Sequence, residues 1–158
     1  SRMYFEKTII FIGKLISLMI PVMTLLMIAV IVARYFFGIG LTGIQELVMY
    51  IHALIFLGCA GYVHLKDEHV RVDIFYRESR SAYKQNTNFI LSFLFLIPVC
   101  FVIGFYSLEL IEMSWKIKEA STEAGGLKFV YVQKSLIILF PITLMMTFVY
   151  QLLNKKWK

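Results

Sequence analysis

The sequence predicts an all-α integral membrane protein, a single membrane domain over residues 1–158 with four transmembrane helices and both termini in the cytoplasm. Of its 158 residues, 59% are hydrophobic and only 16% are charged, and its apolar runs reach the roughly 20 residues that a helix needs to cross a bilayer. Eleven Lys and Arg residues flank one set of span ends and five flank the other. Since cytoplasmic loops carry the excess of positive charge, this asymmetry places both termini and the middle loop inside the cell.

The first apolar segment is longer than one upright span. Its length of about 30 residues corresponds to about 45 Å of helix, which exceeds the thickness of the hydrocarbon core. We therefore place the first span at about residues 15–37. The residues up to Lys14 are expected to form an amphipathic or interfacial extension, because Tyr4, Phe5 and Lys7 suit the headgroup region.

The second span is expected at about residues 44–65, after a glycine-containing turn. Thr42 is followed three residues later by Gln45, which fits a capping box at the start of this helix. The span also contains several small residues, namely Ala53, Gly58, Ala60 and Gly61. Small residues allow helix backbones to approach closely in lipid, so we expect this helix to pack tightly against a neighbour.

The charged stretch Lys66–Tyr76 opens the middle loop, where we expect a short amphipathic turn in the cytoplasm. Asn86, Thr87 and Asn88 are expected to cap a third span at about residues 89–113. A polar outer loop follows, in which Gly125 and Gly126 allow a turn with positive φ. The fourth span is expected at about residues 129–153.

The sequence lacks the side-chain patterns of an enzyme. It has no nucleophile elbow, phosphate loop or His-Glu-x-x-His. The histidines are His52, His64 and His69, so three of the four spans have no haem ligand and no bis-histidine haem is expected. Only His52 lies well inside a span, where we expect a neutral imidazole bonded to a neighbouring helix. We therefore expect no catalysis, metal or cofactor, and the dispersed basic residues indicate no nucleic-acid partner.

Four short motifs follow one another in a characteristic order: Ala-Arg34-Tyr35-Phe, Gln45-Glu46-Leu, Phe-Leu57-Gly58-Cys-Ala60 and Glu68-His69-Val-Arg71-Val-Asp73. Together they resemble the DctQ-like small membrane subunit of tripartite ATP-independent periplasmic (TRAP) transporters, over essentially all four spans. The stretch from Glu119 to Gly126, followed by Lys134-Ser and Pro141, is similar to the branch of this family described for varied organic acids.

This resemblance implies a transport role in a bacterial cytoplasmic (inner) membrane. Such a subunit pairs with a large DctM-like permease subunit that carries the substrate and sodium sites and moves as an elevator. A periplasmic substrate-binding protein delivers the organic acid, and the small subunit braces the static scaffold among the membrane lipids. An apolar midplane without an inverted repeat agrees with this auxiliary role.

Seven residues are expected to have structural or assembly roles: Arg71, Asp73, His69, Glu68, Arg34, Glu46 and Gly58. The motif containing Arg71 and Asp73 is interpreted as a cytoplasmic lock between the two helical hairpins. Arg34 and Glu46 lie across a short turn, where either a salt bridge or separate contacts with solvent and headgroups fit the sequence.

The outer loop contains two further candidate residues, Glu119 and Glu123. They are candidate contacts for the binding protein, and a solvated loop is the alternative.

Two other function classes are weighed against this one. A membrane-anchor subunit of a respiratory complex would require a haem or quinone site, and an absorbance spectrum of the purified chain would reveal the haem. A small self-assembling multidrug exporter would require a carboxylate at the centre of the membrane. The sequence places no Asp or Glu there.

Overall fold

The computed structural model describes residues 2–69 and 81–154, and every regular element within them is helical. Four helical segments are long and apolar enough to cross a membrane: Glu6–Phe37, Thr42–Lys66, Ala82–Lys116 and Val130–Asn154. The prediction of four long apolar helices is therefore confirmed. In lipid, a helix satisfies its own backbone hydrogen bonds, which explains why apolar runs of this length become helices.

Each long segment consists of shorter elements. The first contains α1 (Arg2–Ser17) and α2 (Met19–Phe37), and the second contains α3 (Thr42–Gly58) and α4 (Ala60–Lys66). The third contains α5 (Ser81–Leu91), the π-helical turn η1 (Ser92–Leu96) and α6 (Ile97–Lys116). The fourth contains α7 (Val130–Ser135), the 3₁₀ turn η2 (Leu136–Ile138) and α8 (Leu139–Asn154).

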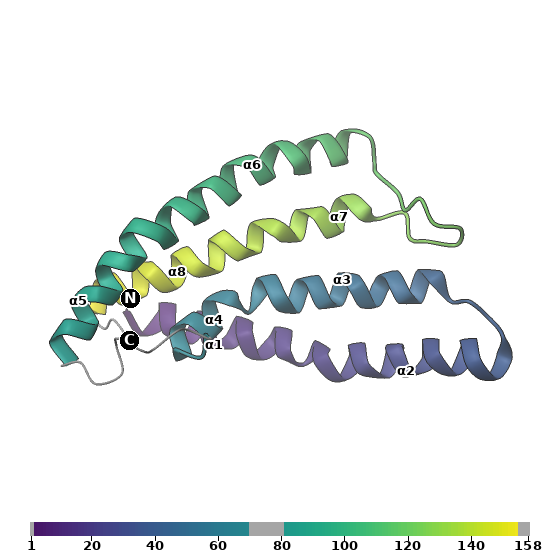
Figure 1. Ribbon diagram of the computed structural model, residues 1–158, viewed down its shortest axis with the longest axis horizontal. Coiled ribbons are helices and arrows are strands. Elements are labelled where there is room, and N and C mark those ends of the chain that lie inside the picture. The colour runs from purple at the N-terminus through teal and green to yellow at the C-terminus, as the bar shows by residue number, and fades with distance from the viewer. Residues whose placement is uncertain (1, 70–80, 155–158) are drawn as a thin grey trace.

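The helices form two hairpins that lie side by side in a flat row (Figure 1). Helix α2 packs on α3, helices α3 and α4 pack on α8, and α8 packs on α6. Helices α2 and α6 are therefore the outer members of the row. The start of α1 and the end of α8 lie at one end of the row, and the loops 38–41 and 117–129 lie at the other (Figure 1). We call the end of the row that contains these two loops the loop end.

All three prolines lie just after a local irregularity in their helix. Pro21 has no N–H to donate to the carbonyl of Ser17, and the helix is interrupted at Leu18. Pro98 follows the π-helical turn η1, and Pro141 follows the 3₁₀ turn η2. Changes in the hydrogen-bond pattern of this kind let a membrane helix continue past a proline.

The N-terminal segment differs from the interfacial extension that the sequence predicted. Helix α1 leads into α2 with only Leu18 between them, and it packs against α3, α4 and α8. Ile9 is only 4% exposed, and the Tyr150 hydroxyl donates to Glu6 Oε2 over 2.6 Å. Sequence reasoning placed a boundary near residue 15 from the length of the segment and from the aromatic and basic residues before it. It could not show that α1 has packing partners in the bundle.

Close packing of small residues is confirmed at the junction of the two hairpins. The Thr147 hydroxyl donates to the Gly61 carbonyl over 2.8 Å, and the Gly61 N–H donates to Thr143 Oγ1 over 3.3 Å. A Cβ added at Gly61 would collide with the Thr143 carbonyl. At Gly58, an added Cβ would lie 2.6 Å from Ile16 Cδ1. Ala60 lies beside them in a core cluster with Cys100 and Leu144.

Two predicted helix caps are wrong. Leu41, not Thr42, is the N-cap of α3, and no side chain caps it. The loop 117–129 instead folds over this helix start, so that a Cβ added at Gly43 would lie 3.1 Å from the Gly125 carbonyl oxygen. Asn86 and Asn88 lie inside α5, which already begins at Ser81, because tertiary context outweighs the weak intrinsic preference of Asn for helix ends.

Candidate functional site

Glu46 joins the first hairpin to the loop of the second. It lies in the first turns of α3, and its Oε1 accepts a hydrogen bond from the Ser121 hydroxyl. Its Oε2 accepts from the Leu127 N–H over 2.6 Å. The loop closes on itself through Ser121 N–H to Leu127 O at 2.9 Å. Glu46 therefore holds the loop 117–129 against the start of α3.

The glycine turn in this loop matches its prediction in part. Gly125 has φ +76°, as predicted for a turn that a glycine permits. Gly126 has a different role, because a Cβ there would lie 2.8 Å from Glu46 Oε1. The second glycine lets the carboxylate of Glu46 approach the loop backbone.

Arg34 does not pair with Glu46. Within residues 2–69 and 81–154 no ion pair joins them, and the hydrogen bonds of the Glu46 carboxylate go to the loop. Arg34 is exposed near the end of α2 and lines the same cavity as Glu46. The salt bridge is therefore not formed. The alternative of contacts with solvent and headgroups fits the exposed Arg34 but not Glu46, which bonds to the loop.

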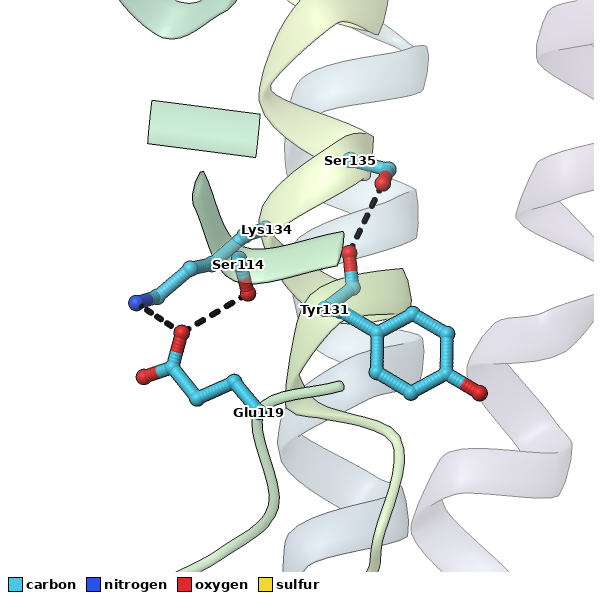
Figure 2. A network of polar contacts seen from close by, with 5 residues as sticks. All are labelled: Ser114, Glu119, Tyr131, Lys134 and Ser135. Carbon is cyan, nitrogen blue, oxygen red and sulfur yellow. Dashed lines mark hydrogen bonds and ion pairs between the residues drawn. The ribbon is translucent and has the colours of Figure 1, made fainter. Parts of the chain in front are cut away.

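Glu119 is the centre of a second polar network at the loop end (Figure 2). Its Oε2 accepts from the Ser114 hydroxyl at 2.7 Å and pairs with Lys134 Nζ at 2.5 Å. These contacts, the Lys134 hydrogen bond first, lower the pKa of Glu119. The carboxylate that we considered for a protein contact is thus engaged within the chain.

Aromatic and hydroxyl groups extend this network along α7. Trp115 Nε1 donates to Ser135 Oγ over 2.7 Å. The Ser135 hydroxyl donates to the Tyr131 carbonyl over 2.7 Å (Figure 2). The Trp115 and Tyr131 rings meet edge to face, with centroids 4.7 Å apart. Glu123, the other candidate contact, is exposed in the same loop, so it is the more accessible carboxylate of the two.

The end of the row opposite the loop end contains Glu68 and His69, the two residues of the motif Glu68-His69-Val-Arg71-Val-Asp73 that the structure describes. Asp67 adopts a left-handed conformation with φ +61°, and the Glu68 N–H donates to the Val63 carbonyl over 3.1 Å, which ends α4. His69 Nε2 lies 3.3 Å from the Ala60 carbonyl oxygen, so this residue folds back onto the hairpin junction. Arg71 and Asp73 lie outside the described residues.

His52 occupies a position that the sequence did not predict. It is exposed on α3 and stacks on Phe56, with ring centroids 6.5 Å apart. None of the described residues of a neighbouring helix bonds to it, so the expected interhelical hydrogen bond is wrong. The stack arises because residues four apart lie on one face of a helix.

Sequence reasoning also missed several partners of the candidate residues. Ser114, Ser121 and Lys134 anchor the two glutamates, and Thr143 and Thr147 bond across the helix junction. The threonines carried a signal, since residues four apart in an apolar helix present two hydroxyls on one face. The serines carried none, because their contacts depend on how the loop folds.

The comparisons with known proteins agree with this arrangement. The sequence model of the DctQ component of tripartite ATP-independent periplasmic transporters matches residues 23–156. Searches of curated proteins and of solved structures gave no match. The matched region includes α3, α6, α8 and both polar networks. The chain therefore belongs to the DctQ family, and it is a membrane subunit of a TRAP transporter and not an enzyme.

Proposed function

We propose that this chain is the scaffold subunit of a sodium-coupled TRAP importer of an organic acid in a bacterial inner membrane. It braces a large DctM-like subunit and helps a periplasmic substrate-binding protein to dock. Membership of the DctQ family supports the transporter assignment. The sodium coupling, the organic-acid class, the bracing and the docking are our inferences.

The exposed face of α3 is the observation that carries the bracing role. Gln45, Met49, His52 and Phe56 recur at helical spacing and are all exposed. This face contains an imidazole about 15 Å from the start of the helix, near the middle of a span. A polar side chain facing lipid at that depth is costly, whereas a protein partner can hydrogen-bond to it. We therefore assign this face to the large subunit.

The shape of the molecule supports the same role. The helices lie in a row (Figure 1), and α2 on its outer edge exposes large apolar side chains such as Leu25 and Ile28. Polar contacts join the hairpins at the loop end through Glu46 and nearer the opposite end through Gly61. Such a row is suited to covering a larger membrane protein and offers no substrate path of its own.

Docking of the binding protein is assigned to the loop end. Our orientation places both termini in the cytoplasm, from the excess of Lys and Arg on that side, so the loop 117–129 faces the periplasm. The two anchored glutamates hold this loop in a fixed shape, and Glu123 remains exposed on it. A preformed loop docks a partner with a smaller entropy cost than a flexible one.

Co-purification tests the assignment of the α3 face. The chain is expressed with a DctM-like large permease subunit, and the amount of permease recovered through a tag on this chain is measured. His52→Arg is expected to reduce recovery at least about tenfold, since a buried charge without a partner costs several kcal/mol. Phe101→Trp on the exposed face of α6 is the control and should leave recovery unchanged.

Two outcomes would contradict the proposal. Failure of the unmodified chain to recover the permease would overturn the scaffold role. Equal losses with His52→Arg and Phe101→Trp would overturn the choice of face.

Uptake of organic acids into proteoliposomes containing the whole transporter, with and without a sodium gradient, tests the coupling. Uptake that is independent of sodium would refute it.

A further inference from the structure

A cavity of 440 Å³ lies at the loop end, between α2, α3, α7 and the loop 117–129. We propose that it binds the phosphoethanolamine headgroup of a membrane phospholipid. The site would be a lipid-binding function of this chain. It shares Gln45 and Met49 with the α3 face, so a lipid bound here would lie at the edge of the proposed contact with the large subunit. Its charges, its unpaired hydroxyl and its depth each support this ligand.

The charges of the cavity suit a zwitterion. Among the described residues, Arg34 is the one cation that lines the cavity, and Glu46 and Glu123 contribute carboxylates. Guanidinium binds phosphate in a bidentate manner, and none of the described residues pairs with Arg34. The carboxylates favour a primary ammonium, which a two-carbon link holds close to the phosphate in phosphoethanolamine. A purely anionic headgroup would meet two negative charges here.

An unpaired hydroxyl indicates that the cavity is built for a ligand. Tyr50 lines it, and the Tyr50 hydroxyl oxygen is buried with no hydrogen-bond partner among the described residues. Buried polar groups are normally paired, and a ligand that reaches this hydroxyl would supply the partner that the described residues lack. Gln45 and Gln133 also line the cavity and add amide groups that suit the ester oxygens of a lipid.

The depth of the cavity matches the headgroup region. It extends from Thr42, the first residue of α3, to Tyr50, which is about 12 Å further along the helix. Arg34 lies close to the end of the preceding apolar helix. The charged groups of Arg34, Glu46 and Glu123 thus lie at span ends, where headgroups lie, whereas Met49 and Tyr50 lie deeper, at the level of the first acyl carbons.

Lipid retention by native mass spectrometry tests the proposal. The full chain is purified, delipidated and titrated separately with dioleoyl phosphatidylethanolamine, phosphatidylcholine and phosphatidylglycerol, and with soluble O-phosphoethanolamine. Phosphatidylethanolamine is expected to bind on the order of tenfold more tightly than phosphatidylcholine, whose methylated ammonium cannot donate hydrogen bonds. Arg34→Gln should weaken its binding about tenfold, and Tyr50→Phe should weaken it several-fold.

Matched controls separate the cavity from the rest of the surface. Lys7→Gln removes an exposed cation at the opposite end, and Tyr83→Phe removes an exposed hydroxyl there. Both should leave lipid binding unchanged. Selective retention of the lipid assigns the site to the membrane, whereas equal binding of soluble O-phosphoethanolamine assigns the same chemistry to a free ligand. Equal retention of all three lipids, or binding that is unchanged by Arg34→Gln and Tyr50→Phe, would overturn the proposal.

Discussion

Gly61 is the residue whose substitution should most affect the contact between the two hairpins. In Gly61→Ala, the new Cβ would collide with the Thr143 carbonyl, which is backbone and cannot rotate away. Helices α4 and α8 must then separate. Overpacking of this kind costs about 1–3 kcal/mol. The two hydrogen bonds that join Gly61 to Thr143 and Thr147 would lengthen, at about 0.6 kcal/mol each in a membrane protein.

The expected loss of stability is therefore about 2–4 kcal/mol. Thermal unfolding of the purified chain in detergent, followed by circular dichroism, measures it as a lower midpoint. Gly104→Ala is a matched control, because a Cβ there would lie 3.9 Å from Pro141, which is an ordinary contact. The reasoning is refuted if Gly61→Ala unfolds with the unmodified chain, or if Gly104→Ala is destabilised equally.

Three further predictions concern the polar residues. Glu46→Ala should free the loop 117–129. Hydrogen exchange of the Leu127 amide should then accelerate at least about tenfold, because the variant loses a charge-assisted hydrogen bond. Exchange at the rate of the unmodified chain would contradict this. The contacts of Glu119 lower the pKa of its carboxyl group. The contribution of Glu119 to stability is therefore complete above the ordinary carboxyl pKa of 4.5 and is lost as the pH falls through the lowered value. Glu119→Gln should flatten the fall of the unfolding midpoint at acid pH, and an unchanged fall would count against the network. Replacing Arg71 or Asp73 should lower co-purification with the large subunit more than it alters substrate affinity; a variant that assembles normally but has a changed affinity would reverse that assignment.

Sequence reasoning predicted the helices well and their ends poorly. An apolar run of about 20 residues has few alternatives to a helix in lipid, so the four spans follow from composition. A cap at Thr42 was a local inference, and it failed because a loop about 80 residues later in the chain covers this helix start. The burial of Ile9 was not predicted for the same reason, because helix α1 packs against helices that are distant in the sequence.

The candidate site was predictable as a set of residues but not as a set of contacts. Glu46 and Glu119 were identified from charge and motif, yet their partners Ser121, Leu127 and Lys134 depend on the loop conformation. In contrast, the Gly61 contact was accessible from sequence as a small residue in an apolar helix. Steric rules transfer from sequence to structure more readily than the choice of hydrogen-bond partners.

The two hairpins are joined at both ends of the row, and this has a mechanical consequence. At the loop end, Glu46 of the first hairpin holds Ser121 and Leu127 of the second. At the other end, Gly61 packs directly on Thr143. Two fixed points prevent the hairpins from rotating about either one alone. A row braced in this way can stay still while a partner moves, which fits the scaffold role that we propose for this chain.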